Sequence, residues 1–225
     1  KADTIASVPE ILFRGQPDAS LPLSTTLERA VASPVSVYAY YHFISVIKSK
    51  VESITGRTWS LPSHDDFVKW TKQIPIFLDL PGYSFFAYLR HHGLPSPLLD
   101  WTRSPFIAAY FAFAHPPNKG VEHVAVFAYL ETPRGFKSGE VGEPTIHKLG
   151  PYVSTHRRHY LQQSEYTICT VGAGDSIHFA THEDVVLRND KNQDLLWKLV
   201  IPATERGNFM RRLQQMNISP YSLFQ

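Results

Sequence analysis

The sequence predicts an α+β fold built on a mixed, mostly antiparallel sheet. Short apolar stretches bounded by turn-forming residues recur along the chain, as strands do. Between the first of them and the next lies a long region of helical periodicity. The chain has 225 residues, 43% of them hydrophobic, which is enough to form a substantial core. We therefore expect one domain with helices grouped around a sheet.

The first expected strand covers residues 9–14 and ends at Gly15 and Pro17, because apolar residues there meet two turn formers. Residues 26–53 are helical in pattern, with a second helix starting at Pro34 after Ser33 as its cap. A third helix is expected from Ser63, since acidic residues occupy its first turn. This helical region is predicted to follow the first strand.

Residues 83–91 have helical character, and residues 94–101 are expected to be extended because two prolines interrupt them. Ser104 and Pro105 then form a strong helix start, and the helix after them is apolar all round, which predicts burial. Strands are predicted at residues 121–130, 176–187 and 197–201, and a polar helix at residues 203–216.

The composition gives a net charge of +2, which neither demands nor excludes a nucleic-acid partner. Cys169 is the only cysteine, so an intramolecular disulfide is excluded, and a reducing, cytoplasmic location is expected. Its apolar neighbours predict a packed strand residue. No apolar run is long enough to span a membrane, and no secretory signal opens the sequence. The apolar end is compatible with a chain that continues beyond residue 225.

Four motifs stand in order along the chain. Phe13-Arg14-Gly15 comes first, His91-His92-Gly93-Leu94-Pro95 second and Leu98-Leu99-Asp100-Trp101-Thr102-Arg103-Ser104-Pro105 third, and Gln162-Gln163 with Tyr166-Thr167 comes last. As an ensemble they resemble the FRG domain family. The resemblance implies a single FRG domain over residues 1–225, with a helical region at about 26–95 inserted after the first strand. Two departures are His92, where a tyrosine is expected, and Ser164-Glu165, where small or apolar residues are expected.

A looser resemblance is to ADP-ribosyltransferases of the Arg-Ser-Glu class. An aromatic-Arg-Gly at a strand end, here around Arg14, is similar to the motif whose arginine holds the NAD phosphates. The hydroxyl-rich Thr102 to Ser104 follows in the required order, and Gln163-Ser164-Glu165 comes last. This resemblance implies an ADP-ribosyltransferase-like fold with NAD as the substrate.

The residue types suit that chemistry. The Arg14 guanidinium matches phosphate, although a structural ion pair explains it equally well, and Gly15 leaves room for a ligand. Glu165 is the candidate catalytic carboxylate, which would stabilise the positive charge that forms on the ribose. Gln163, two residues earlier on an extended chain, would project from the same face. The alternative makes Glu165 a solvent-facing strand residue.

Other residues are assigned around this centre. Thr102 and Ser104 would shape the nicotinamide-ribose pocket, and Tyr110 would stack on a ring unless it packs in the core. His91 would hydrogen-bond the ligand or fix Asp100. Asp100 is expected to be partly buried and to orient Arg14 or Arg103 in a supporting role.

No metal is expected, because adjacent histidines diverge and no carboxylate or cysteine set accompanies them. The predicted function is NAD-dependent ADP-ribosylation of a macromolecule in a toxin or phage-defence role, which leaves room for an antitoxin or regulatory partner. The basic patch His156-Arg157-Arg158-His159 slightly favours nucleic acid over protein as the acceptor. The alternatives are a non-catalytic nucleotide- or nucleic-acid-binding module and an NAD glycohydrolase.

Overall fold

A computed structural model describes residues 10–31, 34–72, 80–138, 142–150, 157–174 and 176–224. Its centre is a seven-stranded sheet in the order β4-β5-β2-β1-β3-β7, with β6 paired to β5. All the strand pairs in these residues are antiparallel. The strands are β1 (Leu12–Gln16), β2 (Leu99–Thr102), β3 (His123–Leu130), β4 (Thr145–Lys148), β5 (Ser164–Ala173), β6 (Ser176–Phe179) and β7 (Leu195–Pro202). The α+β prediction is therefore confirmed.

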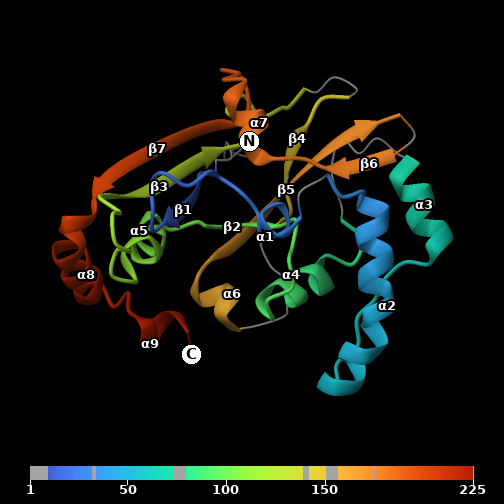
Figure 1. The fold of residues 1–225 in the computed structure, drawn as a ribbon, viewed down its shortest axis with the longest axis horizontal. Helices are drawn as coiled ribbons and strands as arrows, with labels where there is room; N and C mark the ends of the chain where they lie inside the picture. The colour runs from blue at the N-terminus through green and yellow to red at the C-terminus, as the bar shows by residue number, and fades with distance from the viewer. Residues whose placement is uncertain are drawn as a thin grey trace, which may run out of the picture.

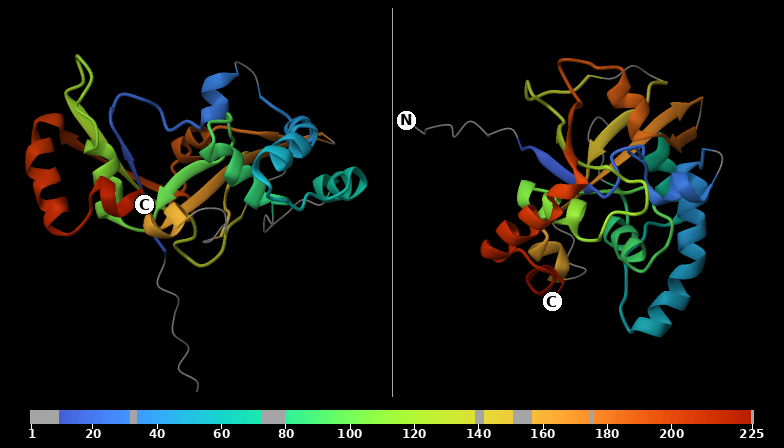
Figure 2. Two further views of the ribbon diagram at one scale, coloured as in Figure 1. Left: turned by 90° about the horizontal axis from the view of Figure 1, so that it is seen from below. Right: turned by 60° about the vertical axis from the view of Figure 1, so that its left-hand side comes forward.

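Four helices come between β1 and β2 in the chain: α1 (Thr26–Ala30), α2 (Val37–Thr55), α3 (His64–Lys72) and α4 (Tyr83–His91). The others are α5 (Pro105–Phe113), α6 (Arg157–Leu161), α7 (His182–Leu187), the 3-10 turn η1 (Ala203–Glu205), α8 (Arg206–Gln215) and α9 (Pro220–Leu223). Figure 1 shows α2 and α3 at one end of the sheet and α5 and α8 at the other, with α1, α4, α6 and α7 between them. Figure 2 shows α8 and α9 together at the end of the sheet far from α2 and α3.

Three apolar clusters hold these layers together. The first joins α2, α3 and α4 to β5 through residues such as Ile44, Phe67 and Ile168. A second joins α5 and α8 to β3. The third lies on the other face of the sheet and includes Trp101 and Cys169, which confirms the packed position predicted for that cysteine. Burial of apolar surface in the three clusters is the main source of stability.

Two predicted helix starts, at Ser63 and at Ser104, are confirmed. The Ser104 hydroxyl accepts a hydrogen bond from the Ile107 amide at 3.3 Å, and Pro105 opens α5. Ser63 caps α3 in the same way, through the Asp66 amide at 3.2 Å. The start predicted at Pro34 was wrong, because α2 begins at Val37 with Ser36 as its cap. Ser33 lies outside the described residues.

Several predicted elements need correction. The stretch 176–187 was predicted as a strand, but it is β6 followed by helix α7, because Thr181 caps a new helix through the Asp184 amide at 3.1 Å. The α5 helix is not buried all round, since Phe106 is 51% exposed. The strand predicted at 9–14 is β1, which starts at Leu12 and runs on through Gly15 to Gln16. The pattern did not predict β4, α6 or α9.

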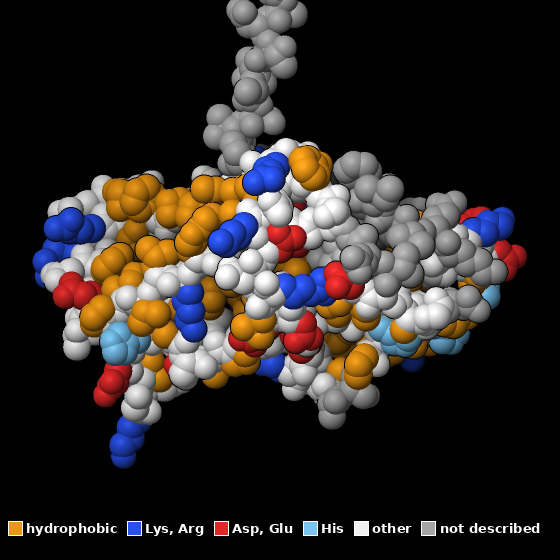
Figure 3. All heavy atoms as spheres, turned by 90° about the horizontal axis from the view of Figure 1, so that it is seen from above, with side chains coloured by type: hydrophobic (Ala, Val, Ile, Leu, Met, Phe, Trp, Pro, Cys, Tyr) orange, Lys and Arg blue, Asp and Glu red, His pale blue; other side chains and the backbone are white. Residues whose placement is uncertain are grey.

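The strand β7 lies at the end of the sheet and pairs with β3. Trp197, Leu199 and Val200 are each about half exposed on it, and hydrophobic side chains gather along this side of the molecule (Figure 3). None of the helices in the described parts of the chain is both long and apolar enough to cross a bilayer.

Candidate functional site

A cavity of about 450 Å³ opens where β1 and β2 separate. Within the described residues these two strands share one paired position, Phe13 with Thr102, and then diverge. On one side β1 continues along β3, and on the other β2 continues along β5. The gap between β1 and β2 is therefore open to side chains from both strands and from the helices beside them.

The cavity wall combines residues from segments that lie far apart in the chain. The strands β1 and β2 contribute Phe13, Arg14, Gly15, Asp100, Trp101 and Thr102. Helices contribute Thr26, Arg90, His91 and Phe111, the turn before β5 contributes Gln162, and β5 itself contributes Ser164 and Tyr166. Of the residues predicted for the site, Arg14, Gly15, His91, Asp100 and Thr102 are thus brought together.

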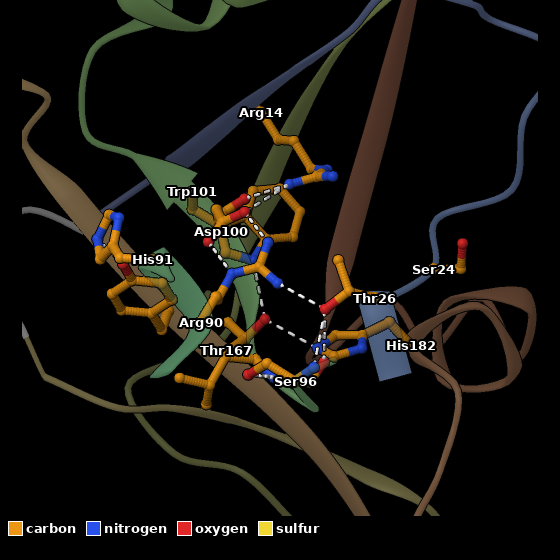
Figure 4. A network of polar contacts seen from close by, with 12 residues as sticks. Arg14, Ser24, Thr26, Arg90, His91, Ser96, Asp100, Trp101, Thr167 and His182 are labelled. Atoms are coloured by element: carbon orange, nitrogen blue, oxygen red, sulfur yellow. Dashed lines mark hydrogen bonds and ion pairs between the residues drawn. The ribbon is translucent and has the colours of Figure 1, made fainter. Parts of the chain in front are cut away.

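Asp100 is held between two arginines at this wall (Figure 4). Arg90 contacts both carboxylate oxygens, through Nε on Oδ1 and Nη2 on Oδ2. The Nη1 atom of Arg14 lies 3.7 Å from Oδ2 and donates to the Asp100 carbonyl oxygen at 2.9 Å. Burial alone would raise the pKa of Asp100, but the charges and hydrogen bonds of Arg90, with the charge of Arg14, hold it below its usual value. Asp100 is thus an ionised carboxylate.

Arg14 and Arg90 differ in how many of their N–H donors make hydrogen bonds. Besides Asp100, Arg90 donates through Nη1 to the Thr26 hydroxyl at 3.0 Å, so its position is fixed on three sides. The Nε–H of Arg14 is buried and has no hydrogen-bond partner among the described residues. A buried donor without a partner is costly, and burial lowers the pKa of Arg14 against the opposing effect of Asp100. Arg14 therefore keeps donor capacity for a ligand.

Gly15 is required by packing. A side-chain Cβ at this position would lie 1.9 Å from the Ala108 carbonyl oxygen and 2.6 Å from the Ala112 amide nitrogen, both in the α5 backbone. The sequence interpretation explained this glycine by room for a ligand. Although Gly15 does line the cavity, the close contact with α5 is what excludes a side chain.

Glu165, the predicted catalytic carboxylate, does not lie at the cavity wall. Its register partner is Trp101, it is 0% exposed, and it does not line the cavity. Its Oε1 accepts from Arg103 Nε at 2.6 Å, and Arg103 also contacts Glu10. Burial raises the pKa of Glu165, with Lys148 and Arg103 opposing. The solvent-facing alternative is excluded, and Ser164 and Tyr166, the neighbours of Glu165 in β5, are the residues that line the cavity.

Four other predicted site residues also lie outside the cavity wall, and one of them is Arg103, which contacts Glu165. Gln163 has a positive φ of 48° just before β5, so it does not extend the strand and does not share the face of Glu165. Ser104 uses its hydroxyl to cap α5, and Tyr110, 4% exposed, packs in the core. Thr102 lines the cavity, but its hydroxyl donates to the Gln162 carbonyl oxygen at 2.7 Å.

A second polar cluster borders the cavity beside Asp100. His159 Nε2 lies 2.8 Å from the Tyr166 hydroxyl oxygen, and His91 Nε2 lies 3.2 Å from the same oxygen. The two imidazoles also contact each other through their Nε2 atoms. His159 is 3% exposed, so it is not part of a basic surface patch as the sequence suggested. His156, from the same patch, lies outside the described residues.

Residues 9–120 match the FRG domain family. The chain carries an FRG domain. The match covers Arg14, Arg90, His91 and Asp100, while the β5 side of the cavity lies beyond it. Searches among curated proteins and among solved structures gave no match.

Sequence reasoning missed Arg90 and Tyr166 as cavity residues of this FRG domain. A signal for Arg90 was present, because it directly precedes the histidine pair in the second motif. In the described parts of the chain, no group of three or more His, Cys, Asp or Glu side chains is arranged to hold a metal ion.

Proposed function

We propose that the cavity of this FRG domain binds NAD and that the chain transfers ADP-ribose from NAD to a macromolecule. The observation that carries the proposal is Arg14, whose Nε–H is buried at the cavity without a partner in the described residues. A guanidinium with unused donors suits a phosphate, which it binds through parallel charge-assisted hydrogen bonds.

The charge of the wall supports a phosphate ligand. Arg14 and Arg90 bring two positive charges, while Asp100 is the one carboxylate among the described residues that line the cavity. The remaining positive charge favours the two negative charges of the NAD diphosphate. The volume of about 450 Å³ lies in the range typical of small-molecule sites.

The wall also offers flat apolar surfaces. Phe13 of β1 and Phe111 of α5 line the cavity and are each partly exposed, and aromatic side chains pack well against the planar nicotinamide and adenine rings. A ligand that carries a planar ring beside its phosphates is therefore compatible with the wall.

The order of strands supports the transferase resemblance. The arginine, hydroxyl and Gln-x-Glu motifs of that resemblance fall on or beside β1, β2 and β5, which are neighbours in the sheet. Bond cleavage between nicotinamide and ribose builds positive charge on the sugar, which a nearby carboxylate stabilises. In this proposal Asp100 supplies that carboxylate, because it faces the cavity and Glu165 does not.

A non-catalytic nucleotide-binding module is the second candidate. The two arginines around Asp100 favour this candidate, because their positive charges offset the carboxylate charge that would stabilise a ribosyl cation. This candidate predicts NAD binding without release of nicotinamide. The acceptor is proposed only as a macromolecule, because the basic patch that favoured nucleic acid includes a buried His159.

Calorimetric titration of NAD into the wild type and Arg14→Gln tests the binding step. Losing charge-assisted hydrogen bonds of about 1.5–3 kcal/mol should weaken NAD affinity by roughly 10- to 100-fold. The matched control is Arg188→Gln, which removes an arginine that contacts Glu143 away from this wall. Unchanged affinity in a folded Arg14→Gln protein would refute the phosphate role.

Labelled NAD tests the reaction in a second assay. Free nicotinamide and label on protein, RNA and DNA are followed separately in a cell extract. Label on a macromolecule supports transfer, whereas nicotinamide release without label indicates a glycohydrolase. Tight binding with neither product supports the non-catalytic module.

A further inference from the structure

The strand β7 forms one edge of the sheet over eight residues. It pairs with β3 at a constant register from Leu195 to Pro202, so no bulge interrupts it. Among the described residues, no side chain and no segment other than β3 hydrogen-bonds to the backbone of β7. An edge of this length presents a row of amide and carbonyl groups to which another strand can pair.

The opposite edge of the sheet, at β4, is protected against such pairing. This strand has only four residues. The Lys137 ammonium donates to its Ile146 carbonyl oxygen. Its Lys148 amide donates to Glu131 Oε1 at 3.2 Å. Short strands and charged side chains are two means by which proteins block their sheet edges, and β7 is longer and lacks such side-chain bonds in the described part of the chain.

The side chains of β7 also favour a second strand. Three of its apolar side chains are each about half exposed, namely Trp197, Leu199 and Val200, and hydrophobic groups gather along this side of the molecule (Figure 3). The one charged residue of β7, Lys198, lies over the ring of its register partner Phe127, with the ammonium nitrogen 5.5 Å from the ring centroid. That nitrogen also donates to the Ala19 carbonyl oxygen at 2.6 Å. The lysine side chain therefore lies across β3, and the free edge stays apolar.

We propose that β7 pairs antiparallel with β7 of a second copy of this chain, so that two seven-stranded sheets join into one. A twofold axis perpendicular to the sheet relates the two copies in such a pair. Directly opposite residues of an antiparallel pair point to the same face of the sheet. The axis therefore passes through one position of β7, at which a residue lies opposite its own copy.

Charge selects this position. Lys198 and Leu199 are the two central residues of β7. An axis at Lys198 would place two lysines directly opposite each other, which is unfavourable. An axis at Leu199 places leucine opposite leucine, Trp197 opposite Ile201 of the other copy, and Val200 opposite the aliphatic stem of Lys198. The strand is then its own apolar complement, whereas a charged partner strand would find no counter-charge along this edge.

This pairing leaves the cavity accessible. In the strand order β2-β1-β3-β7, the whole of β3 separates the β7 edge from the gap between β1 and β2. No residue of β7 is among the described residues that line the cavity. The inference is therefore independent of the proposed function, and NAD affinity should be the same in dimeric and monomeric variants.

Sedimentation velocity tests the pairing with charges placed on the axis. The wild type should sediment as a dimer. Leu199→Lys and Leu199→Glu should each raise the dissociation constant of the dimer by about 100-fold or more, because like charges meet across the axis. An equimolar mixture of the two variants should form a dimer again, since opposite charges then meet. The matched control is Val46→Lys on α2, 58% exposed in the wild type, which should stay dimeric.

Disulfide cross-linking checks the register. Leu199→Cys should form an intermolecular disulfide on mild oxidation, because opposite Cα atoms of an antiparallel pair lie about 4.5–5.5 Å apart. Trp197→Cys should not cross-link, since its two copies would lie roughly 14 Å apart along the strands. The natural Cys169 is 1% exposed, so it does not compete. Thermal melts and NAD titration establish that each variant is folded.

Three outcomes would overturn the inference. A wild type that is monomeric at every concentration would mean that another segment of the chain or a different partner covers the β7 edge. A mixture of folded Leu199→Lys and Leu199→Glu that stays monomeric would exclude an axis at this residue. Equal cross-linking of Leu199→Cys and Trp197→Cys, or none in either, would exclude the proposed register.

Discussion

The Arg90 guanidinium binds the Asp100 carboxylate bidentately, because its Nε contacts Oδ1 and its Nη2 contacts Oδ2. This geometry is the strongest that an arginine and a carboxylate adopt. It joins the end of α4 to β2, and Thr26 adds α1 to the same arginine. The residue just before the second sequence motif is therefore linked to the third motif by one ion pair at the cavity wall.

We expect Asp100→Asn to lower the stability of the protein. The substitution keeps the size of the side chain but leaves Arg90, 12% exposed, without its counter-charge. Removing one partner of a buried pair costs about 3–5 kcal/mol, and roughly half of that is expected because 43% of the Asp100 side chain is exposed. A thermal melt measures the effect, with the surface variant Asp184→Asn as the control. An unchanged melting temperature with lost turnover would assign Asp100 a purely chemical role.

Gly15→Ala should destabilise the fold by about 1–3 kcal/mol or more, because the new methyl group meets the backbone of α5. Backbone atoms in a helix cannot move aside as a flexible side chain can. The matched control is Gly207→Ala in α8, where nothing lies within 4 Å of the added Cβ. That control should gain about 0.5–1 kcal/mol, since alanine favours a helix over glycine. Denaturant unfolding of both variants would reveal effects of opposite sign.

Glu165→Gln should leave NAD affinity and nicotinamide release at the wild-type level. Its carboxylate contacts Arg103 and does not line the cavity, so its charge is not presented to a ligand there. Titration and the nicotinamide assay check this, with Asp100→Asn as the contrasting variant. A loss of about 100-fold or more in release, in a protein that melts normally, would restore Glu165 as the catalytic carboxylate.

His182 should make the protein sensitive to acid. Burial, followed by the charges of Arg14 and Lys137, lowers its pKa to about 3, so the folded protein holds this ring neutral. Between about pH 6.5 and pH 3 the unfolded chain binds the proton and the folded one does not. The contribution of neutral His182 to stability is therefore fully present above about pH 6.5. As the pH is lowered through the window, the free energy of unfolding decreases by up to about 1.4 kcal/mol per pH unit.

Unfolding free energies measured from pH 7 to pH 3 check this expectation. His182→Gln should flatten the slope across the window, because its amide does not titrate. His147, whose pKa burial lowers to about 4, provides a comparison: His147→Gln should flatten the slope only above about pH 4. An unaltered slope in His182→Gln would show that this ring does not govern acid stability.

The sequence predicted the parts of the fold that local chemistry controls. Ser104 and Pro105 signalled α5 because a hydroxyl cap and a fixed proline φ are both local properties. The strand β6 was predicted, but the prediction ran on through α7, since apolar residues near Val185 pack against the sheet whether the backbone is strand or helix. Tertiary contacts decided between the two.

The sequence identified site residues only where the chemistry of the side chain itself indicates a ligand. Arg14 was found because a guanidinium matches phosphate and because Phe13-Arg14-Gly15 resembles the first motif of the family. Glu165 was misplaced because the face of a strand residue depends on where the strand begins, and Gln163 at φ 48° breaks the expected alternation. The pairing of His91 with His159 joins residues 68 positions apart, which no local pattern specifies.

The position of β5 in the sheet has a consequence for the family match. The matched range ends at residue 120, yet β2 is paired along its full length with β5, residues 164–173. A fragment cut at the family boundary would lack that neighbour. It would expose the backbone donors and acceptors of β2 as a bare edge ready to recruit other chains. Expressed alone, the matched segment should therefore aggregate, and the recognisable part of this protein is smaller than its folding unit.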